Sequence, residues 1–258
     1  MCELLGMSAN VPTDICFSFT GLMQRGGRTG PHSDGWGITF YEGKGCRTFK
    51  DPMPSSQSRI ARLVQEYPIK SCAVVSHIRQ ANRGGVSLEN THPFTRELWG
   101  HYWTFAHNGQ LTGYDALPTG RFQPVGATDS EVAFCWLLNE LEQRFSQRPD
   151  EPELASAIWI CCQQLRGMGV FNMLLTDGEL VIGYCSTNLH WLTRRAPFGE
   201  ATLLDEDVSV DFQKETTPDD VVTLIATLPL TSNEPWQKMS AGDCVLFRFG
   251  ERMLSFAE

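Results

Sequence analysis

Two helical segments that follow each other directly are the feature that most limits how this 258-residue chain folds. Apolar residues recur at helical spacing over residues 134–145 and again over residues 154–165. The segments typical of β-strands lie mostly before and after this pair of helices, and not between them. Because helices and strands come in blocks, the pattern favours stacked layers over a doubly wound parallel sheet.

Short turns join several of the expected strands. Gly43-Lys44-Gly45 and Asp177-Gly178 each separate two apolar segments, which is typical of antiparallel hairpins. No repeat, low-complexity tract or linker interrupts the chain, so we expect a single α+β domain over residues 2–258. Strands are predicted at residues 2–7, 36–41, 46–50, 71–78, 102–106, 170–176, 179–185, 189–193, 221–227 and 244–249.

Composition and charge exclude several classes of function. A formal net charge of -9 disfavours binding to nucleic acid and fits a protein that acts on small molecules. No apolar run approaches the roughly 18 residues of a membrane span, and the N-terminus lacks a signal-peptide pattern, so we expect a cytoplasmic protein. The nine cysteines contain no Cys-x-x-Cys, so neither a disulfide framework nor a metal site is indicated.

Cys2 is the first candidate for chemistry. A cysteine behind the initiator methionine is small enough for an aminopeptidase to expose, which leaves one residue with both a thiol and a free α-amine. The amine titrates near ~7.7–8.0 and the thiol near ~8.5, so the amine can take the thiol proton at neutral pH. The alternative is that Cys2 is a small buried hydrophobic residue, as most cysteines are.

Three further sites carry polar residues where strands end or a helix begins. Arg79 follows a buried apolar strand and can grip a carboxylate with its planar guanidinium. Asn108-Gly109 follows an aromatic strand and can donate N–H groups to an oxyanion, although Asn-Gly is also a strong hairpin signal. Thr128 and Asp129 begin a helix, and either one is a natural N-cap without any substrate.

The order of these features resembles a known family. Cys2, Ser76-His77-Ile78-Arg79-Gln80-Ala81, His107-Asn108-Gly109 and Thr128-Asp129-Ser130-Glu131 together resemble the class II glutamine amidotransferase domain, an N-terminal-nucleophile hydrolase. This resemblance implies a four-layer αββα sandwich of two antiparallel sheets with helices on both outer sides.

The resemblance also assigns roles to individual residues. It implies that Cys2 is the nucleophile, that Asn108 and Gly109 form the oxyanion hole, that Arg79 binds the α-carboxylate of glutamine and that Asp129 binds its α-ammonium. It implies no metal and no organic cofactor.

The chain departs from the family after Arg79. Asn82 and Arg83 stand where many members have threonine and histidine. An asparagine can still hydrogen-bond a substrate carboxylate, with different donor geometry, so Asn82 is included among the substrate-binding residues.

The likeness is to free-standing members of the family. In keeping with this, the sequence contains no Gly-x-x-x-x-Gly-Lys phosphate loop and no second enzyme. We expect hydrolysis of a γ-glutamyl amide through a thioester on Cys2, with ammonia passing to water or to a separate acceptor enzyme. One alternative is a hydrolase of a specific γ-glutamyl conjugate, of the ergothioneine-pathway or glutathione-degradation type.

Two further alternatives remain. The bile-salt and penicillin amidase branch also begins at a cysteine, but its substrates do not need paired charges. A non-catalytic glutamine-binding protein is favoured if Met1 is retained.

Overall fold

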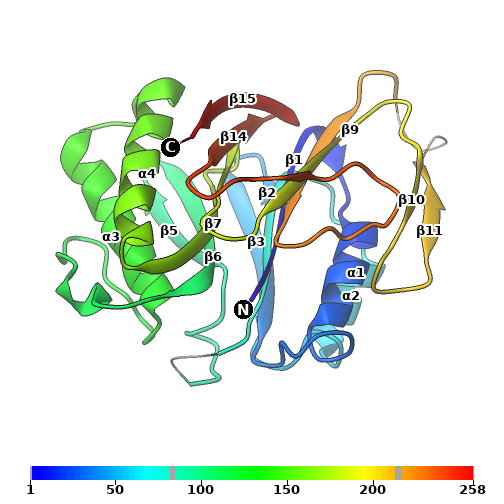
Figure 1. Ribbon diagram of the computed structural model, residues 1–258, viewed down its shortest axis with the longest axis horizontal. Helices are drawn as coiled ribbons and strands as arrows, with labels where there is room; N and C mark the ends of the chain where they lie inside the picture. Colours follow the sequence, from blue (N-terminus) through cyan, green and yellow to red (C-terminus); the bar gives the residue numbers. More distant parts are fainter. Residues whose placement is uncertain (1, 82–84, 213–216, 258) are drawn as a thin grey trace.

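The computed structural model describes residues 2–81, 85–212 and 217–257 and arranges them in four layers (Figure 1). A seven-stranded sheet and a six-stranded sheet face each other in the middle of the molecule. Helices α1 and α2 cover the outer side of the first sheet, and α3 and α4 cover the outer side of the second. The strand pairs in both sheets are antiparallel. The expected αββα sandwich is confirmed.

The seven-stranded sheet has the order β13-β9-β12-β1-β4-β2-β3 and the six-stranded sheet the order β15-β14-β8-β7-β6-β5, while β10 and β11 form a separate hairpin. The helices are α1 (Cys16–Arg25), α2 (Arg59–Glu66), α3 (Asp129–Arg144) and α4 (Glu151–Arg166), with a 3₁₀ turn η1 (Tyr114–Ala116). The strands are β1 (Glu3–Thr13), β2 (Trp36–Glu42), β3 (Gly45–Asp51), β4 (Ser71–Ile78), β5 (Phe94–Leu98), β6 (His101–Leu111), β7 (Gly169–Thr176), β8 (Leu180–Tyr184), β9 (His190–Arg195), β10 (Glu200–Thr202), β11 (Ser209–Asp211), β12 (Val221–Ala226), β13 (Gln237–Lys238), β14 (Cys244–Arg248) and β15 (Glu251–Phe256).

Three apolar cores separate the four layers. Neighbouring residues of one strand enter different cores, because side chains alternate across a strand. Leu4 of β1 packs between the two sheets, whereas Leu5 packs under α1 and α2. Ala106 of β6 likewise packs between the sheets, whereas Phe105 packs under α3 and α4. This alternation directs Cys2, two residues before Leu4, toward the space between the sheets.

The helix starts follow the capping residues in the sequence, with one exception. Thr128 caps α3 and Asp150 caps α4, and each side chain accepts the backbone N–H three residues later. The N-cap position of α1 is Ile15, which makes no side-chain capping bond, while the carboxylate of Asp14 accepts the Cys16 N–H at 3.2 Å.

The expected break in β6 does not occur. The strand was predicted to stop before Asn108-Gly109, but it continues to Leu111 and pairs with β7, with Asn108 opposite Asn172. Pairing along β7 therefore overrides the local turn preference of Asn-Gly, and the hairpin interpretation is wrong. A Cβ at Gly109 would overlap the Val170 carbonyl oxygen, so close approach of β7 explains this glycine.

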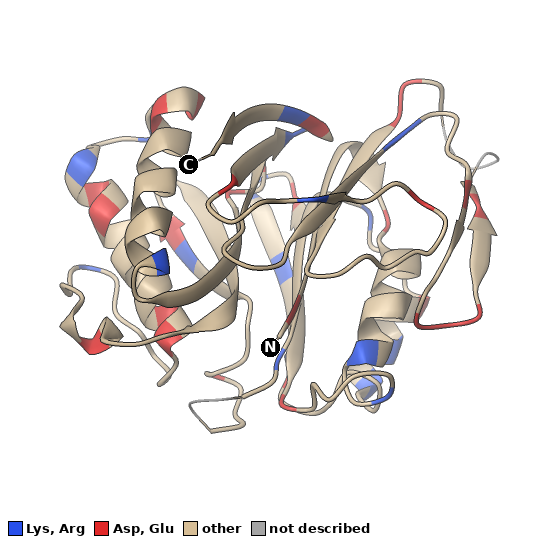
Figure 2. Cartoon of the chain, in the orientation of Figure 1, with Lys and Arg blue, Asp and Glu red and all other residues tan. Residues whose placement is uncertain are grey.

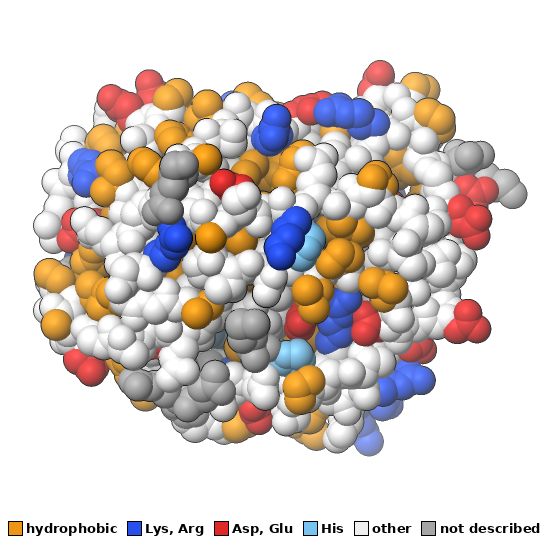
Figure 3. Space-filling model, viewed as in Figure 1, with side chains coloured by type: hydrophobic (Ala, Val, Ile, Leu, Met, Phe, Trp, Pro, Cys, Tyr) orange, Lys and Arg blue, Asp and Glu red, His pale blue; other side chains and the backbone are white. Residues whose placement is uncertain are grey.

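The surface mixes both signs of charge. Positions of lysine and arginine are interspersed with positions of aspartate and glutamate along much of the chain (Figure 2). The face shown in Figure 3 likewise intersperses basic, acidic and hydrophobic side chains. Among the described residues, no helix is long and apolar enough to cross a membrane.

Candidate active site

Cys2 directly precedes β1, and the N-terminal end of the chain lies near the middle of the molecule (Figure 1). Glu3 pairs with Ile78 of β4, which brings the residues after β4 beside Cys2. The Gln80 backbone N–H donates to Cys2 Sγ at 3.3 Å, and Sγ lies 3.5 Å from the Gln80 carbonyl oxygen. The Cys2 side chain is therefore fixed by the backbone, and 9% of the residue is exposed.

The surroundings of Cys2 disfavour a thiolate in the absence of a base. Burial raises the pKa of the Cys2 thiol above its ordinary value, and the carboxylate of Asp129 raises it further. The Gln80 N–H and the charge of Arg79 lower this pKa, but burial is the larger effect. A reaction at Cys2 therefore needs an adjacent proton acceptor.

A small cavity of about 30 Å³ opens at the Cys2 thiol. It brings together four of the six predicted site residues, namely Cys2, Arg79, Gly109 and Asp129. Asn108 does not line the cavity, but the next residue, Gly109, does. Asn82 lies outside the described residues. The complete lining is Cys2, Arg79, Gln80, Ala81, His92, His107, Gly109, Gln110, Thr128, Asp129 and Ser130.

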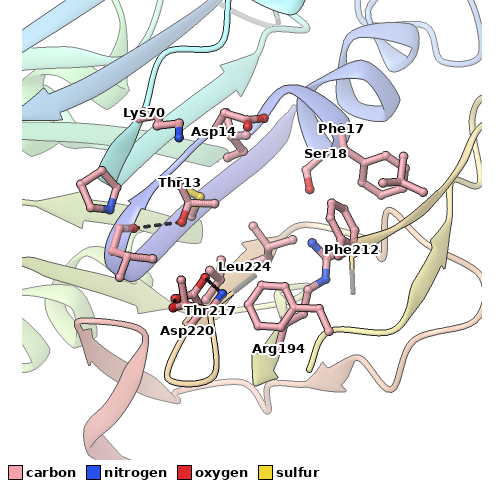
Figure 4. Close-up of a pocket in the computed structure, with 17 residues that line it drawn as sticks. Thr13, Asp14, Phe17, Ser18, Lys70, Arg194, Phe212, Thr217, Asp220 and Leu224 are labelled. Carbon is pink, nitrogen blue, oxygen red and sulfur yellow. Dashed lines mark hydrogen bonds between the residues drawn. The ribbon is translucent and has the colours of Figure 1, made fainter. Parts of the chain in front are cut away.

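A larger cavity of about 470 Å³ lies elsewhere, on the outer side of the seven-stranded sheet (Figure 4). Phe17, Phe212 and Leu224 are among its lining residues, and none of its described lining residues is a cysteine or a histidine. Met7 also lines this cavity and stands five residues beyond Cys2 on β1, which corresponds to roughly 17 Å of strand. Although it is larger, this cavity has no cysteine among its described lining residues, so the small cavity at the Cys2 thiol is the candidate active site.

Asp129 is the first residue of α3, and Thr128 takes the capping role. The carboxylate of Asp129 accepts the Leu111 N–H at 2.7 Å and the Ser130 N–H at 2.9 Å. These bonds hold a buried negative charge on the wall of the cavity and join the end of β6 to α3. A helix cap does not account for Asp129, because Thr128 already supplies it.

Arg79 supplies the positive charge of the cavity. It is 3% exposed, and its Nη1 donates to the Gly85 carbonyl oxygen at 3.0 Å. Its backbone N–H donates to Gly35 O at 2.8 Å. Asp34, which was not predicted as a site residue, accepts the Ala81 N–H at 2.7 Å. The Asp34-Gly35 segment thus fixes the chain on both sides of Gln80, the residue that contacts the thiol.

The side chain of Asn108 is fully buried behind the cavity. Its Nδ2 donates to Thr227 Oγ1 at 3.3 Å, while Oδ1 has no hydrogen-bond partner among the described residues. An amide nitrogen carries two N–H groups, so the second N–H of Nδ2 makes no hydrogen bond within the described part of the chain. A buried polar atom without a partner is costly, and such atoms often mark functional sites.

Three buried histidines lie at or beside the cavity, and none of them was predicted as a site residue from the sequence. His77 and His92 stack with ring centroids 4.1 Å apart, and His107 lies 2.8 Å from the Ser130 hydroxyl. Burial lowers the pKa of all three, that of His77 to about 3, so the rings are neutral at neutral pH. His92 lines the cavity with both ring nitrogens unpartnered in the described part of the chain.

The model of the family described as class II glutamine amidotransferases matches residues 1–258. The chain belongs to this family. It is 71% identical to "Putative glutamine amidotransferase YafJ" of Escherichia coli over 98% of this chain and all of that relative. It is 48% identical to "Putative glutamine amidotransferase" of Haemophilus influenzae, over 98% of this chain and 86% of that relative.

Two solved structures share the fold of this chain. A predicted glutamine amidotransferase from Pseudomonas aeruginosa aligns with a TM-score of 0.80 and 54% identity, over 98% of this chain and all of that one. The glutamine phosphoribosylpyrophosphate amidotransferase of Bacillus subtilis aligns with a TM-score of 0.64 over 99% of this chain and 49% of that chain. At 15% identity, the second likeness shows the fold alone.

Proposed function

We propose that this amidotransferase-family protein hydrolyses a γ-glutamyl amide bond, with glutamine as the simplest substrate, through a γ-glutamyl thioester on Cys2. The observation that carries the proposal is the single cavity that joins the Cys2 thiol, the Arg79 guanidinium and the Asp129 carboxylate. Glutamine is a zwitterion with an amide at its far end. Its α-carboxylate matches Arg79, its α-ammonium matches Asp129, and its amide carbon then faces the thiol.

The raised pKa of the Cys2 thiol supports a role for its own α-amine as the base. After removal of Met1, which lies outside the described residues, the free amine of Cys2 takes the thiol proton. Sγ then attacks the amide carbon, the C–N bond breaks, and the amine returns the proton to the leaving ammonia. Water next attacks the thioester, gives its proton to the amine, and releases glutamate and the thiol.

Negative charge develops on the amide oxygen in both steps. The Asn108 amide and the Gly109 backbone N–H are the donors proposed for this oxygen, and preorganised donors of this kind supply a large share of catalysis in acyl transfer. No metal or organic cofactor takes part in these steps. Within the described residues, no cluster of histidine, cysteine, aspartate and glutamate side chains is arranged to hold a metal ion.

The experiment is glutamine hydrolysis by the purified full chain, measured as glutamate and ammonia released in equal amounts. Cys2→Ala should abolish the reaction, whereas the matched variant Cys16→Ala should leave it unchanged, because Cys16 lies on α1 and burial raises its pKa to about 11. Turnover that survives in Cys2→Ala would refute the mechanism. Preference for N-acyl amides without the paired charges would favour the penicillin-amidase type of substrate.

Binding without turnover would distinguish the remaining alternative. If calorimetry detects glutamine binding to processed protein but no glutamate forms, the protein is a non-catalytic glutamine-binding member. If γ-glutamyl conjugates are hydrolysed and glutamine is not, the leaving amine contributes recognition beyond the γ-glutamyl group. A separate acceptor enzyme is indicated if its addition changes the rate of ammonia release.

A further inference from the structure

Thr227 connects β1, which begins directly after Cys2, to β6, the strand that carries Asn108. It follows β12 directly and is 3% exposed. Its Oγ1 accepts the Leu4 backbone N–H at 2.9 Å and the Asn108 Nδ2–H at 3.3 Å. One buried hydroxyl therefore bonds both to β1, two residues after the nucleophile, and to the proposed oxyanion donor.

The position of Thr227 is itself fixed by its backbone. Its N–H donates to the Leu4 carbonyl oxygen at 3.2 Å, and its own carbonyl oxygen lies 2.9 Å from His190 Nδ1. With both backbone groups bonded, the hydroxyl cannot move far from its place between β1 and β6. Thr227 is thus a rigid link and not a mobile side chain.

The Asn108 amide depends on this link. Oδ1 of Asn108 is buried and has no partner in the described part of the chain, so Thr227 supplies the hydrogen bond that the structure shows for this amide. Asn108 lies two residues from Ala106, and Cys2 lies two residues from Leu4, and both Ala106 and Leu4 pack between the sheets. By strand alternation, the thiol and the amide face the same space.

We propose that Thr227 is a positioning residue. Its hydroxyl holds the Asn108 amide at a fixed place relative to β1, so that the second Nδ2–H points to the developing oxyanion. This inference rests on the proposed function. It assigns to Thr227 no contact with the substrate and no proton transfer. Without the hydroxyl, the amide loses its bond and the Leu4 N–H loses its acceptor.

The expected effect is on turnover and not on substrate binding. Misplacement of a catalytic group by about 1 Å can cost about 10²-fold, so Thr227→Val should lower kcat by about 10- to 100-fold and change KM by less than about threefold. Thr227→Ser keeps the hydroxyl and should restore kcat to within about threefold of the parent. If Thr227→Val does not fold, Thr227→Ala takes its place.

The matched control is Thr223→Val in β12, the strand that Thr227 follows. Thr223 is fully buried, and its hydroxyl donates to the Gly250 carbonyl oxygen at 2.7 Å, but it pairs with Ser8, six residues beyond Cys2. This variant removes a comparable buried hydroxyl far from the thiol. It should lower the thermal midpoint and leave kcat unchanged.

A reversible inhibitor isolates the oxyanion site. In a glutamine analogue with an aldehyde in place of the amide, Cys2 Sγ bonds to the aldehyde carbon, and the carbonyl oxygen becomes the oxyanion or takes the thiol proton. Its affinity should weaken in Thr227→Val by the same factor as kcat/KM, whereas binding of the product glutamate should stay unchanged.

The outcomes separate the two proposals. Normal kcat in Thr227→Val, the same loss in Thr223→Val, no rescue by Thr227→Ser, or equal weakening of aldehyde and glutamate binding would each overturn the role of Thr227 alone. If the processed parent neither hydrolyses γ-glutamyl amides nor binds the aldehyde, the proposed function falls, and the role of Thr227 falls with it.

Discussion

Replacing Asp129 with asparagine tests whether this carboxylate binds substrate or only supports the fold. In the structure its two oxygens accept the backbone N–H groups of Leu111 and Ser130, at 2.7 and 2.9 Å. Asparagine removes the negative charge and places an amide N–H₂ against one of these donors. We therefore expect two separable effects, one on stability and one on recognition of the α-ammonium group.

The size of each effect follows from the contacts. Leaving one buried N–H without an acceptor should lower the free energy of unfolding by about 1–3 kcal/mol. Losing a buried charged partner of the substrate should cost about 2–4 kcal/mol in binding, at the low end of the range for such pairs. Since about 1.4 kcal/mol is tenfold, kcat/KM for glutamine should fall by roughly 30- to 1,000-fold.

The assay compares glutamine with glutaramate, which is glutamine without its α-amino group. The parent should strongly prefer glutamine. Asp129→Asn should hydrolyse both substrates with similar kcat/KM, because the carboxylate that binds the α-ammonium is absent. Asp150→Asn, which alters the N-cap of α4, controls for the cost of changing a carboxylate at a helix start. If Asp129→Asn keeps the preference of the parent, Asp129 has only a structural role.

Three further changes test the rest of the site. Arg79→Lys should lower kcat/KM for glutamine by a factor that corresponds to about 2–4 kcal/mol. It should leave kcat/KM for 4-aminobutanamide, which lacks the α-carboxylate, unchanged, and equal losses for both substrates would contradict the carboxylate assignment. Asn108→Asp should lower kcat by a factor of about 10²–10³. Near-normal turnover in a folded Asn108→Asp variant would refute the oxyanion role. Its thermal midpoint should also fall, because Asn108 is fully buried, so alkylation of Cys2 is the control for folding. For His77, a pKa of about 3 in the folded protein against about 6.5 unfolded means that only the unfolded state gains a proton as pH falls from 6.5 toward 3. Its contribution to the free energy of unfolding is therefore complete above about pH 6.5 and should decrease by about 1.4 kcal/mol per pH unit below it. Urea unfolding at about pH 6 and pH 5 should show that the free energy of unfolding falls less between these two pH values in His77→Phe than in the parent.

The order of motifs in the sequence was enough to predict the fold, and four of the residues that it singled out lie together in the structure. Cys2, Arg79, Gly109 and Asp129 do line one cavity, because the ends of β1, β4 and β6 and the start of α3 meet there. Local patterns were less reliable than this order. Asn108 stands in a strand although Asn-Gly favours a turn, since pairing with β7 outweighs the local preference.

Residues that act through distant contacts could not be found from local patterns. Thr227 bonds to Leu4 across 223 positions of the chain, and Asp34 bonds to Ala81 across 47. The unpartnered ring of His92 has meaning only beside the cavity that it lines. The strands β5 and β15 were also missed, because both are edge strands with partly exposed faces and weak hydrophobic alternation.

The central claim is that Cys2, freed as the N-terminal residue, is the nucleophile. The most direct test treats the native full-length protein with a diazo-ketone analogue of glutamine and locates the label by intact-mass measurement and peptide mapping. We predict a chain that begins at Cys2 and carries one label, on Cys2, with none on the other eight cysteines and with loss of labelling when excess glutamine is present. Glutamine-hydrolysing protein that retains Met1, or a label on any other cysteine that abolishes activity, would contradict the claim.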